Sequence, residues 1–550
     1  MQIEGLDLGI IALYFVFILA LGLWAGLRKK RTKQASEYFL AGKSLRWPVI
    51  GLALFATNIS TVHLVSLAEE GYANGLAYGN FEWMAPFTLI FLALFFAPFY
   101  IRSRITTLPD FLEKRYSRAS RDWLSLLSMV SAIFIHIGFS LYAGAVVLEG
   151  MFGLDKNVSI IVIAGLTGLY TIVGGLLAVV LTESVQTIIL LIGAAVLTSI
   201  AYVNAGGWAG ISGSVDAVQL TVLRPHGDPS GLPWYAVFLG YPIIGIWYWC
   251  TDQTIVQRVL GAKDEEHARI GPLFAGFIKI LPVFIFVLPG LIGLALINQG
   301  LMPPLPLTEA GVPDAAKTLS HMITHLLPIG LRGLMAAALM AALMSTVSGA
   351  LNSVATLFTY DLYQRRAPKT SEKKLVLIGR VVTFVGMVLA VLWSPLCGRF
   401  PTVFHGINAL ISYLAPPITV VFVAGVFWKK ASSKASFITL VSGSSLGLVV
   451  FLLDFNGLLQ RFKDSFPGFG FLNFMVISFL LAVICAVILV SMSFLFPETL
   501  TQEKSLLVWK SFLEPIREKG RRGLGNYKLL SAVLAGVMIA LYVIFTFFVK

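Results

Sequence analysis

The sequence has few charged residues and few cysteines for its length. Only 13% of its 550 residues are charged, whereas soluble globular chains carry about 25%. The three cysteines, Cys250, Cys397 and Cys485, lie far apart, without metal-ligand or disulfide spacing. No CxxC, HExxH, GxSxG or P-loop motif occurs, and no polar stretch is long enough for a catalytic domain. The low share of charged residues excludes an ordinary soluble protein, and the cysteines imply no redox role.

Apolar stretches, in contrast, recur along the whole chain. Hydrophobic residues make up 57% of it, and the mean hydropathy is +0.83. A membrane-spanning helix needs about 20 apolar residues, so we predict an all-α polytopic membrane protein with 14 transmembrane helices. The predicted spans are 7–27, 46–70, 78–101, 124–150, 158–178, 184–204, 234–256, 272–298, 333–360, 376–396, 403–427, 435–455, 472–495 and 529–549. No cleavable signal peptide is expected, because the basic cluster at 28–31 follows the first span.

The net charge is +13, and the basic residues are distributed according to the predicted topology. If the N-terminus lies outside, the loops that face the cytoplasm hold most of the 41 Lys and Arg residues. This distribution is the positive-inside pattern. It predicts a multi-pass protein of the cell membrane with both termini extracellular or periplasmic, in contact with the lipid bilayer and not with nucleic acid.

Two of the predicted spans carry clusters of polar residues. The second span includes Asn58, Ser60 and His63, and the seventh places aromatic residues beside the polar run 251–253. Interrupted helices free backbone groups for a cation and a solute, although polar packing between helices is the alternative. Since the two spans are five apart, we predict a five-plus-five inverted repeat. Its transport core is 46–455 (repeats 46–204 and 234–455), with extra helices in 1–45 and 456–550.

Single ionisable residues inside spans are functional candidates. Glu82, beside two aromatic residues, could cap a helix N-terminus or accept hydrogen bonds from a ligand. Lys279 could reach the cytoplasmic surface or meet an acid or a polar ligand deeper in the membrane. Ser345 and Ser348 share one face of the ninth span, and their oxygens suit a hard cation such as Na⁺. Tight packing of small residues is the alternative for that face.

Several motifs, in this order, resemble the sodium/solute symporter family in its sodium–glucose cotransporter branch. The resemblance runs from about residue 38 to 430. It rests on Ala56–Ser60, Phe81–Trp83, Thr107–Tyr116, Gly174–Leu176 with Thr182, Glu183 and Gln186, Trp247–Gln253 with Gln257 and Arg258, Asn352–Ser353, Thr359–Tyr363 and Tyr413–Pro417.

The resemblance implies a LeuT-type inverted-repeat fold, with one N-terminal and three C-terminal extra helices, and Na⁺-driven uptake of a sugar or polyol. The implied Na⁺ site consists of the carbonyls of Ala56, Ile59 and Ala342 and the hydroxyls of Ser345 and Thr346. The implied solute site consists of Asn58, His63, Glu82, Tyr248, Trp249, Lys279 and Asn408. Leu67, Phe81 and Phe404 would form an outer hydrophobic gate and Tyr248 the inner one.

Three departures from the family pattern concern the ligands. Asn408 stands where family members place glutamine, and Gly245 where they offer Asn or Thr. A second Na⁺ site would use Glu183, in place of an aspartate, and Ser348. Gly349 replaces a hydroxyl residue there and supplies no side-chain oxygen. The sequence therefore favours one Na⁺ per solute.

The function we expect is Na⁺-coupled symport of a neutral, glucose-like hexose or a polyol by alternating access. One alternative is another small solute, such as an inositol, a carboxylate or an amino acid. Another is a solute sensor or channel without coupling. A membrane enzyme is disfavoured because no intramembrane acid pair or metal cluster is visible, and the sequence does not imply an oligomer.

Overall fold

The structure, a computed structural model, describes residues 5–28, 39–59, 61–228, 230–308, 311–399, 403–518, 523 and 525–548. The basic run after Arg28 and the motif residue Ser60 lie outside the described residues. Within these ranges the chain is helical and has no strand, only isolated bridges such as that between Leu45 and Ala262.

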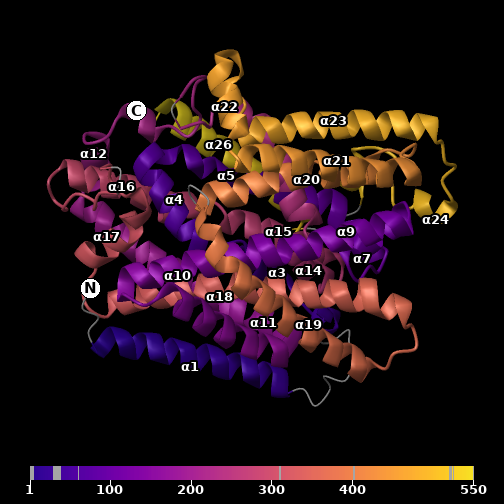
Figure 1. Cartoon of the computed structure of the whole chain (residues 1–550), viewed down its shortest axis with the longest axis horizontal. Helices are drawn as coiled ribbons and strands as arrows, with labels where there is room; N and C mark the ends of the chain where they lie inside the picture. Colours follow the sequence, from indigo (N-terminus) through magenta and orange to yellow (C-terminus); the bar gives the residue numbers. More distant parts are fainter. Residues whose placement is uncertain are drawn as a thin grey trace.

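The helices run through the whole described chain (Figure 1). The α-helices are α1 Gly5–Arg28, α3 Trp47–Asn58, α4 Thr61–Asn74, α5 Asn80–Trp83, α6 Ala85–Phe91, α7 Ala97–Arg102, α8 Leu108–Arg115, α9 Arg118–Val130, α10 Gly138–Phe152, α11 Lys156–Asn204, α12 Gly207–Ser212, α13 Trp234–Ile246, α14 Gln253–Leu260, α15 Glu265–Ile278, α16 Leu288–Asn298, α17 Thr318–Leu326, α18 Leu331–Leu357, α19 Glu372–Trp393, α20 Val403–Phe427, α21 Ser433–Phe455, α22 Leu458–Ser465, α23 Phe474–Leu495, α24 Gln502–Ser505, α25 Glu514–Arg517 and α26 Tyr527–Val543. π-helical turns occur at Leu92–Phe96, Ser131–Ile137, Trp247–Thr251, Val283–Val287, Phe358–Gln364 and Ile544–Phe548, and 3₁₀ turns at Ala41–Lys43, Gly75–Gly79, Ala217–Leu220, Ala315–Lys317, Ser394–Arg399 and Pro467–Phe469.

Twelve helical segments of the described chain are long and apolar enough to cross a membrane. The structure therefore does not give fourteen uninterrupted spans. The two predicted spans that are missing as single long helices are the second and the seventh. In the second, α3 is a shorter apolar helix that ends at Asn58. In the seventh, the helix is broken at Asp252. Both predicted interruptions are thus confirmed.

One predicted boundary lies elsewhere in the structure. The spans 158–178 and 184–204 form the two halves of α11, and the break between them is at Gly175. Gly175 has φ 60° and ψ −159°, a conformation that is open to glycine but costly for other residues.

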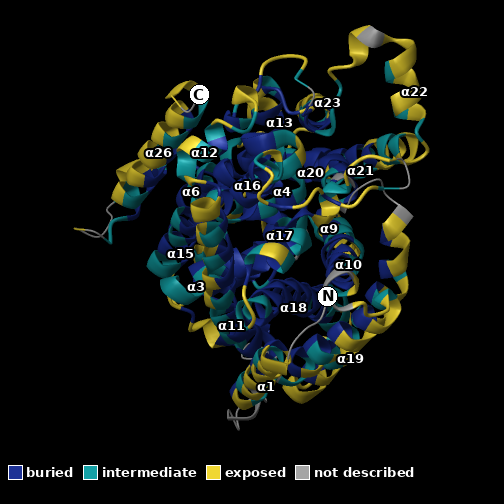
Figure 2. Ribbon diagram, turned by 90° about the vertical axis from the view of Figure 1, so that its left-hand side faces the viewer, coloured by how far each residue is buried: buried dark blue, intermediate teal, exposed yellow. Residues whose placement is uncertain are grey.

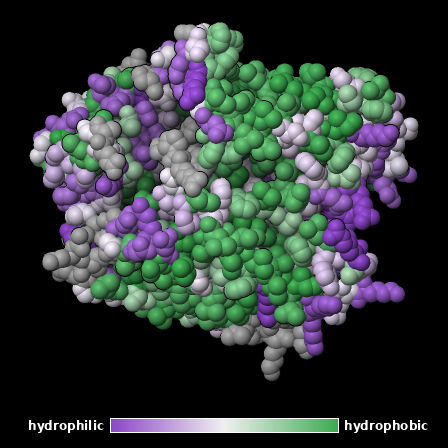
Figure 3. Space-filling view, viewed as in Figure 1, coloured by the Kyte–Doolittle hydropathy of each residue, from purple (hydrophilic) through white to green (hydrophobic). Residues whose placement is uncertain are grey.

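The helix α18 lies at the centre of the bundle, and the other helices surround it (Figure 2). In the segment Leu331–Gln364, which contains α18, 94% of the most apolar stretch is buried. In the first helix the buried share of the corresponding stretch is 22%. Figure 2 shows α18 in dark blue inside the bundle and exposed residues on α1, α19 and α26 around it. In Figure 3 hydrophobic residues form a broad belt across the middle of the face shown, and hydrophilic residues gather toward its left and right ends. A helical bundle with an apolar belt fits a bilayer.

The first helix holds one end of α18. Asp7 Oδ1 accepts hydrogen bonds from the backbone N–H groups of Gly330 (2.8 Å) and Gly333 (2.7 Å). These amides belong to the helix N-terminus, where they have no intrahelical acceptor and where the dipole favours negative charge. The start of α1 and the end of α26 both lie on the left-hand side of Figure 1.

The motif at 107–116 has a structural role. Arg115 is 1% exposed and donates to the carbonyls of Gly425 (2.8 Å), Trp428 (2.9 Å) and Ala431 (3.2 Å). It therefore caps the C-terminal end of α20, whose last carbonyls have no N–H partner in the helix. Tyr116 adds a hydrogen bond to the carbonyl of Val421 (2.9 Å).

Candidate functional site

The first part of the site is the buried end of α3. Ile59 has an extended backbone (φ −78°, ψ 102°), so the helix stops at Asn58 inside the bundle. The last carbonyls of a helix need partners from outside it. Two hydroxyls of α18 supply them: Ser345 Oγ donates to the Ala56 carbonyl (2.7 Å) and Thr346 Oγ1 to the Thr57 carbonyl (3.2 Å).

These contacts gather the predicted Na⁺ ligands in one place. The Ala342 carbonyl lies 2.9 Å from Ser345 Oγ and 3.3 Å from Thr346 Oγ1. The carbonyl of Ala56 joins this group, and Ile59 follows in extended backbone. All the candidate donors are oxygens, which a hard cation requires. The negative end of the α3 dipole also points here. The residues present therefore fit Na⁺.

The break in the seventh span lies next to this helix end. After α13 and its π-helical turn, Asp252 is extended (φ −80°, ψ 124°) and its carboxylate accepts from the Thr254 N–H (2.6 Å) to start α14. The turn brings Tyr248 into contact with α3, because Asn58 Nδ2 donates to Tyr248 OH at 3.2 Å.

One cavity lies between the two interrupted helices. It is lined by all seven predicted solute-site residues and by the three predicted outer-gate residues. These are Asn58, His63, Glu82, Tyr248, Trp249, Lys279 and Asn408, with Leu67, Phe81 and Phe404. The structure thus brings together residues from 58 to 408 in the sequence.

The polar centre of this cavity is a buried charge pair. Lys279 is 1% and Glu82 2% exposed, and Lys279 Nζ donates to the Glu82 carboxylate and to Asn58 Oδ1. One alternative left open by the sequence is therefore wrong: Lys279 does not reach the surface, since it ends α15 in the interior. Glu82 lies in the first turn of α5, and its carboxylate accepts from Lys279. Together the three side chains form a neutral group with donors and acceptors.

Aromatic residues close one side of the cavity. The Phe81 and Phe404 rings meet edge to face with centroids 5.1 Å apart, and Tyr78 packs on Phe404 at 5.2 Å. Tyr241 holds this layer by donating to the Phe81 carbonyl (2.8 Å), and Leu67 is 1% exposed. Tyr78 and Tyr241 were not predicted, because nothing in their local sequence distinguishes them from other buried tyrosines.

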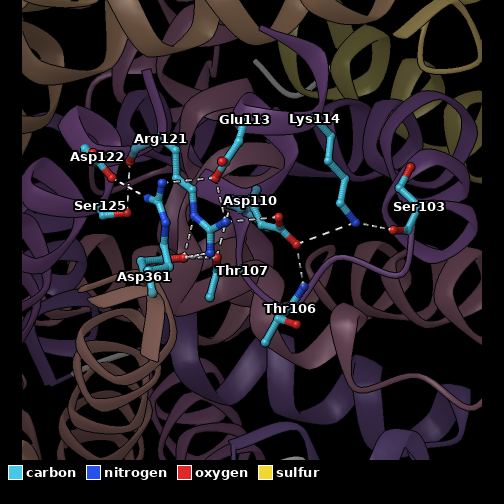
Figure 4. Close-up of polar contacts among 12 residues, drawn as sticks. Ser103, Thr106, Thr107, Asp110, Glu113, Lys114, Arg121, Asp122, Ser125 and Asp361 are labelled. Atoms are coloured by element: carbon cyan, nitrogen blue, oxygen red, sulfur yellow. Dashed lines mark hydrogen bonds and ion pairs between the residues drawn. The ribbon is translucent and has the colours of Figure 1, made fainter. Parts of the chain in front are cut away.

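A network of charges ties together helix ends at another part of the bundle (Figure 4). Arg121 of α9 donates to the carboxylates of Asp361 (2.8 Å), Glu113 (2.8 Å) and Asp110 (3.3 Å). Thr107 also donates to Asp361 (2.9 Å). The network joins α8 and α9 to the turn that follows α18, so these elements must separate if this side opens. The sequence motifs include several of these residues but do not reveal their partners.

Sequence reasoning also missed His136. It lines the cavity from the π-helical turn before α10, and its Nε2 lies 3.2 Å from Asp252 Oδ2. Its ring lies 5.9 Å from that of Tyr248. The signal was available, because a histidine in the middle of the span 124–150 is itself a functional candidate.

The two residues of the possible second Na⁺ site make other contacts. Glu183 Oε1 accepts from Arg258 Nη2 (2.6 Å) and from Thr57 Oγ1 (3.0 Å). Ser348 Oγ donates to the Ser345 carbonyl (3.0 Å). Asn408 Nδ2 donates to the Phe404 carbonyl of its own helix (2.9 Å).

A membrane bundle with two helices broken around a central cavity defines the class of secondary transporters. The model of the sodium:solute symporter family matches residues 38–443, and the chain belongs to this family. It is a multi-pass membrane transporter and not an enzyme.

Curated relatives agree with this assignment, and a solved structure shares the fold. The chain is 35% identical over 547 residues to sodium/myo-inositol cotransporter 2 of Mus musculus, covering 94% of this chain and 81% of that protein. It is 34% identical over 519 residues to sodium/glucose cotransporter 1 of Oryctolagus cuniculus, covering 88% and 78%. The structure is similar to a substrate-bound, outward-open Na⁺-coupled sialic acid symporter, with a TM-score of 0.76, 22% identity and coverage of 91% and 100%. The fold is thus of the LeuT type, as predicted.

The first prediction concerns the charge pair in the cavity. Replacing Lys279 by Met or Glu82 by Gln should each lower the unfolding free energy by about 3–5 kcal/mol, because either change leaves one buried group without its partner. The unfolding free energy of the double variant should fall by much less than the sum of the two single losses. Thermal unfolding of purified protein in detergent measures this.

The exposed pair Lys156–Glu149 (3.0 Å) is the matched control. Lys156→Met and Glu149→Gln should each change stability by no more than about 1 kcal/mol. Strictly additive losses at Lys279 and Glu82 would contradict the proposed pairing.

Proposed function

We propose that the protein takes up a neutral sugar or polyol together with Na⁺ by alternating access. One observation carries the proposal. The neutral group Glu82–Lys279–Asn58 lines a cavity directly beside the oxygen cluster at the end of α3. Because Asn58 ends that helix, a cation at the cluster and a solute in the cavity would both act on the same helix end.

The substrate class follows from the charges in the cavity. Lys279 already has a carboxylate partner, so an anionic solute would have to compete with Glu82 for it. A polyhydroxyl solute can instead donate to Glu82 and accept from Lys279, and hydrogen bonds to charged groups contribute roughly 1.5–3 kcal/mol each. The names of the two relatives, a myo-inositol and a glucose cotransporter, fall in this class.

A single Na⁺ at the cluster would suffice to drive uptake. One charge crossing about 100 mV supplies ~2.3 kcal/mol, and a tenfold Na⁺ gradient adds ~1.4 kcal/mol. The sum corresponds to a solute gradient of several hundredfold, so we propose one Na⁺ per solute.

For the topology we propose that both chain ends lie outside the cell. The basic loops support this orientation, and the network around Arg121 would then close the cytoplasmic side. The two inverted repeats of five spans each would be 46–204 and 234–427, each beginning with an interrupted helix.

The second prediction concerns coupling itself. Proteoliposomes given radioactive glucose or myo-inositol should accumulate solute when an inward Na⁺ gradient is imposed, and not with choline in place of Na⁺. Equal uptake in both salts would rule out coupling. A Na⁺ current without solute flux would identify a channel instead.

The third prediction concerns the Na⁺ ligands. Replacing Ser345 and Thr346 by Ala should raise the Na⁺ concentration for half-maximal uptake by about tenfold or more, since each lost contact to a charge is worth roughly 1.5–3 kcal/mol. Ser353→Ala on the same helix is the control, because its buried hydroxyl has no hydrogen-bond partner among the described residues. An unchanged Na⁺ dependence of the double variant would remove these two residues from the site.

A further inference from the structure

A second buried charge pair lies close to the proposed Na⁺ site. Arg258 of α14 and Glu183 of α11 both have side chains that are 0% exposed, and Arg258 Nη2 lies 2.6 Å from Glu183 Oε1. Arg258 Nη1 also donates to the Thr254 carbonyl within its own helix. The guanidinium is therefore fixed at both ends.

The space for this guanidinium depends on a glycine of α18. A Cβ atom at Gly349 would overlap Arg258 Nη2 and would approach Glu183 Oε1 to 3.0 Å. Because residue 349 is a glycine, the possible second Na⁺ site has no side-chain oxygen from this position. The same glycine leaves room for the cationic side chain of Arg258.

The pair is connected to the proposed Na⁺ site through Thr57. Its hydroxyl lies 3.0 Å from Glu183 Oε1, and its carbonyl accepts from Thr346 Oγ1 at 3.2 Å. Four helices, α3, α11, α14 and α18, meet in this way around one carboxylate.

We propose that the Arg258 guanidinium is a resident cation in the place that a second Na⁺ would take, which fixes the coupling at one ion per solute. This inference rests on the proposed function. It assigns to Arg258 a role in the ion stoichiometry, which neither the sequence motifs nor the family match provides.

Charge balance supports the assignment. The single charge of Glu183 is neutralised by the guanidinium of Arg258. A Na⁺ at the same carboxylate would place two positive charges against one negative charge in a water-poor interior, where such repulsion is weakly screened. With the guanidinium present, the site has no net charge left to attract an ion.

The chain retains oxygens that could hold an ion if the guanidinium were absent. Glu183 Oε2 has no hydrogen-bond partner among the described residues, and the Thr57 hydroxyl lies beside the other carboxylate oxygen. Ser348 directly precedes Gly349 in α18. Removing the charge of Arg258 should therefore leave a carboxylate that needs a cation.

The test measures ion stoichiometry in proteoliposomes. The parent protein should show a hyperbolic Na⁺ dependence of uptake and a reversal potential for one Na⁺ per solute. Arg258→Gln should make the Na⁺ dependence sigmoidal, with a Hill coefficient rising from near one toward two. In Glu183→Gln/Arg258→Gln, which lacks both charges, the Hill coefficient should remain near one.

A further pair of variants tests the space at residue 349 and guards against misfolding of Arg258→Gln. Gly349→Ser alone should lower the thermal stability, because the new side chain meets the guanidinium. Arg258→Gln/Gly349→Ser should be more stable than Gly349→Ser, since the serine fills the vacated volume. Because the serine hydroxyl adds an oxygen ligand, uptake by this double variant should also depend on Na⁺ sigmoidally, with a Hill coefficient toward two.

Two results would overturn the proposal: two Na⁺ per solute in the parent protein, or a Hill coefficient near one in both Arg258→Gln and Arg258→Gln/Gly349→Ser. Loss of the proposed function would be seen separately, because the parent protein would then show no Na⁺-stimulated uptake at all.

Discussion

The rest of the structure depends on how α3 ends. A helix that stops inside a membrane bundle leaves carbonyl groups that neither water nor lipid can satisfy. In this protein the hydroxyls of Ser345 and Thr346 satisfy them, which fixes α18 against the broken helix. Asp7 of the first helix holds the N-terminal end of α18. The same requirement that stabilises the fold thus creates a cluster of oxygens suited to a cation.

Buried charges among the described residues follow a second constraint, because a charge in the interior needs polar or charged partners. Lys279 pairs with Glu82, Arg258 with Glu183, and Arg121 with Asp361. Each pair joins different helices, so each pair restricts how those helices move relative to one another. The pair Lys279–Glu82 lines the cavity and can exchange hydrogen bonds with a solute. The side chains of the pair Arg258–Glu183 are fully buried, and their charges neutralise each other.

Much of the architecture could be predicted from local signals. Long apolar runs located the membrane helices, and polar residues in the second and seventh spans indicated their interruption, because such residues are costly in lipid. The break at Gly175 was misplaced by a few residues, since one glycine conformation and not hydropathy determines it. The motifs and their order identified the family and residues that now line one cavity.

Pairings between distant residues could not be predicted. The sequence presented Arg258 only as a motif residue and Glu183 as a possible Na⁺ ligand. Their contact could not be predicted, because it depends on the space left by Gly349 on a third helix. The contact of Arg121 with Asp361 was missed because Asp361 comes from a segment far away in the sequence, and only the packed bundle brings the two together. His136 was missed although its position inside the span 124–150 made it a functional candidate.

The central claim is that a cation at the end of α3 and a solute in the adjacent cavity stabilise one common arrangement of the site. Calorimetric titration of the purified protein with glucose or myo-inositol, at several Na⁺ concentrations, tests it most directly. The account predicts that Na⁺ tightens solute binding and that solute tightens Na⁺ binding by the same factor, as linkage requires. Equal solute affinity in Na⁺ and in choline would contradict it.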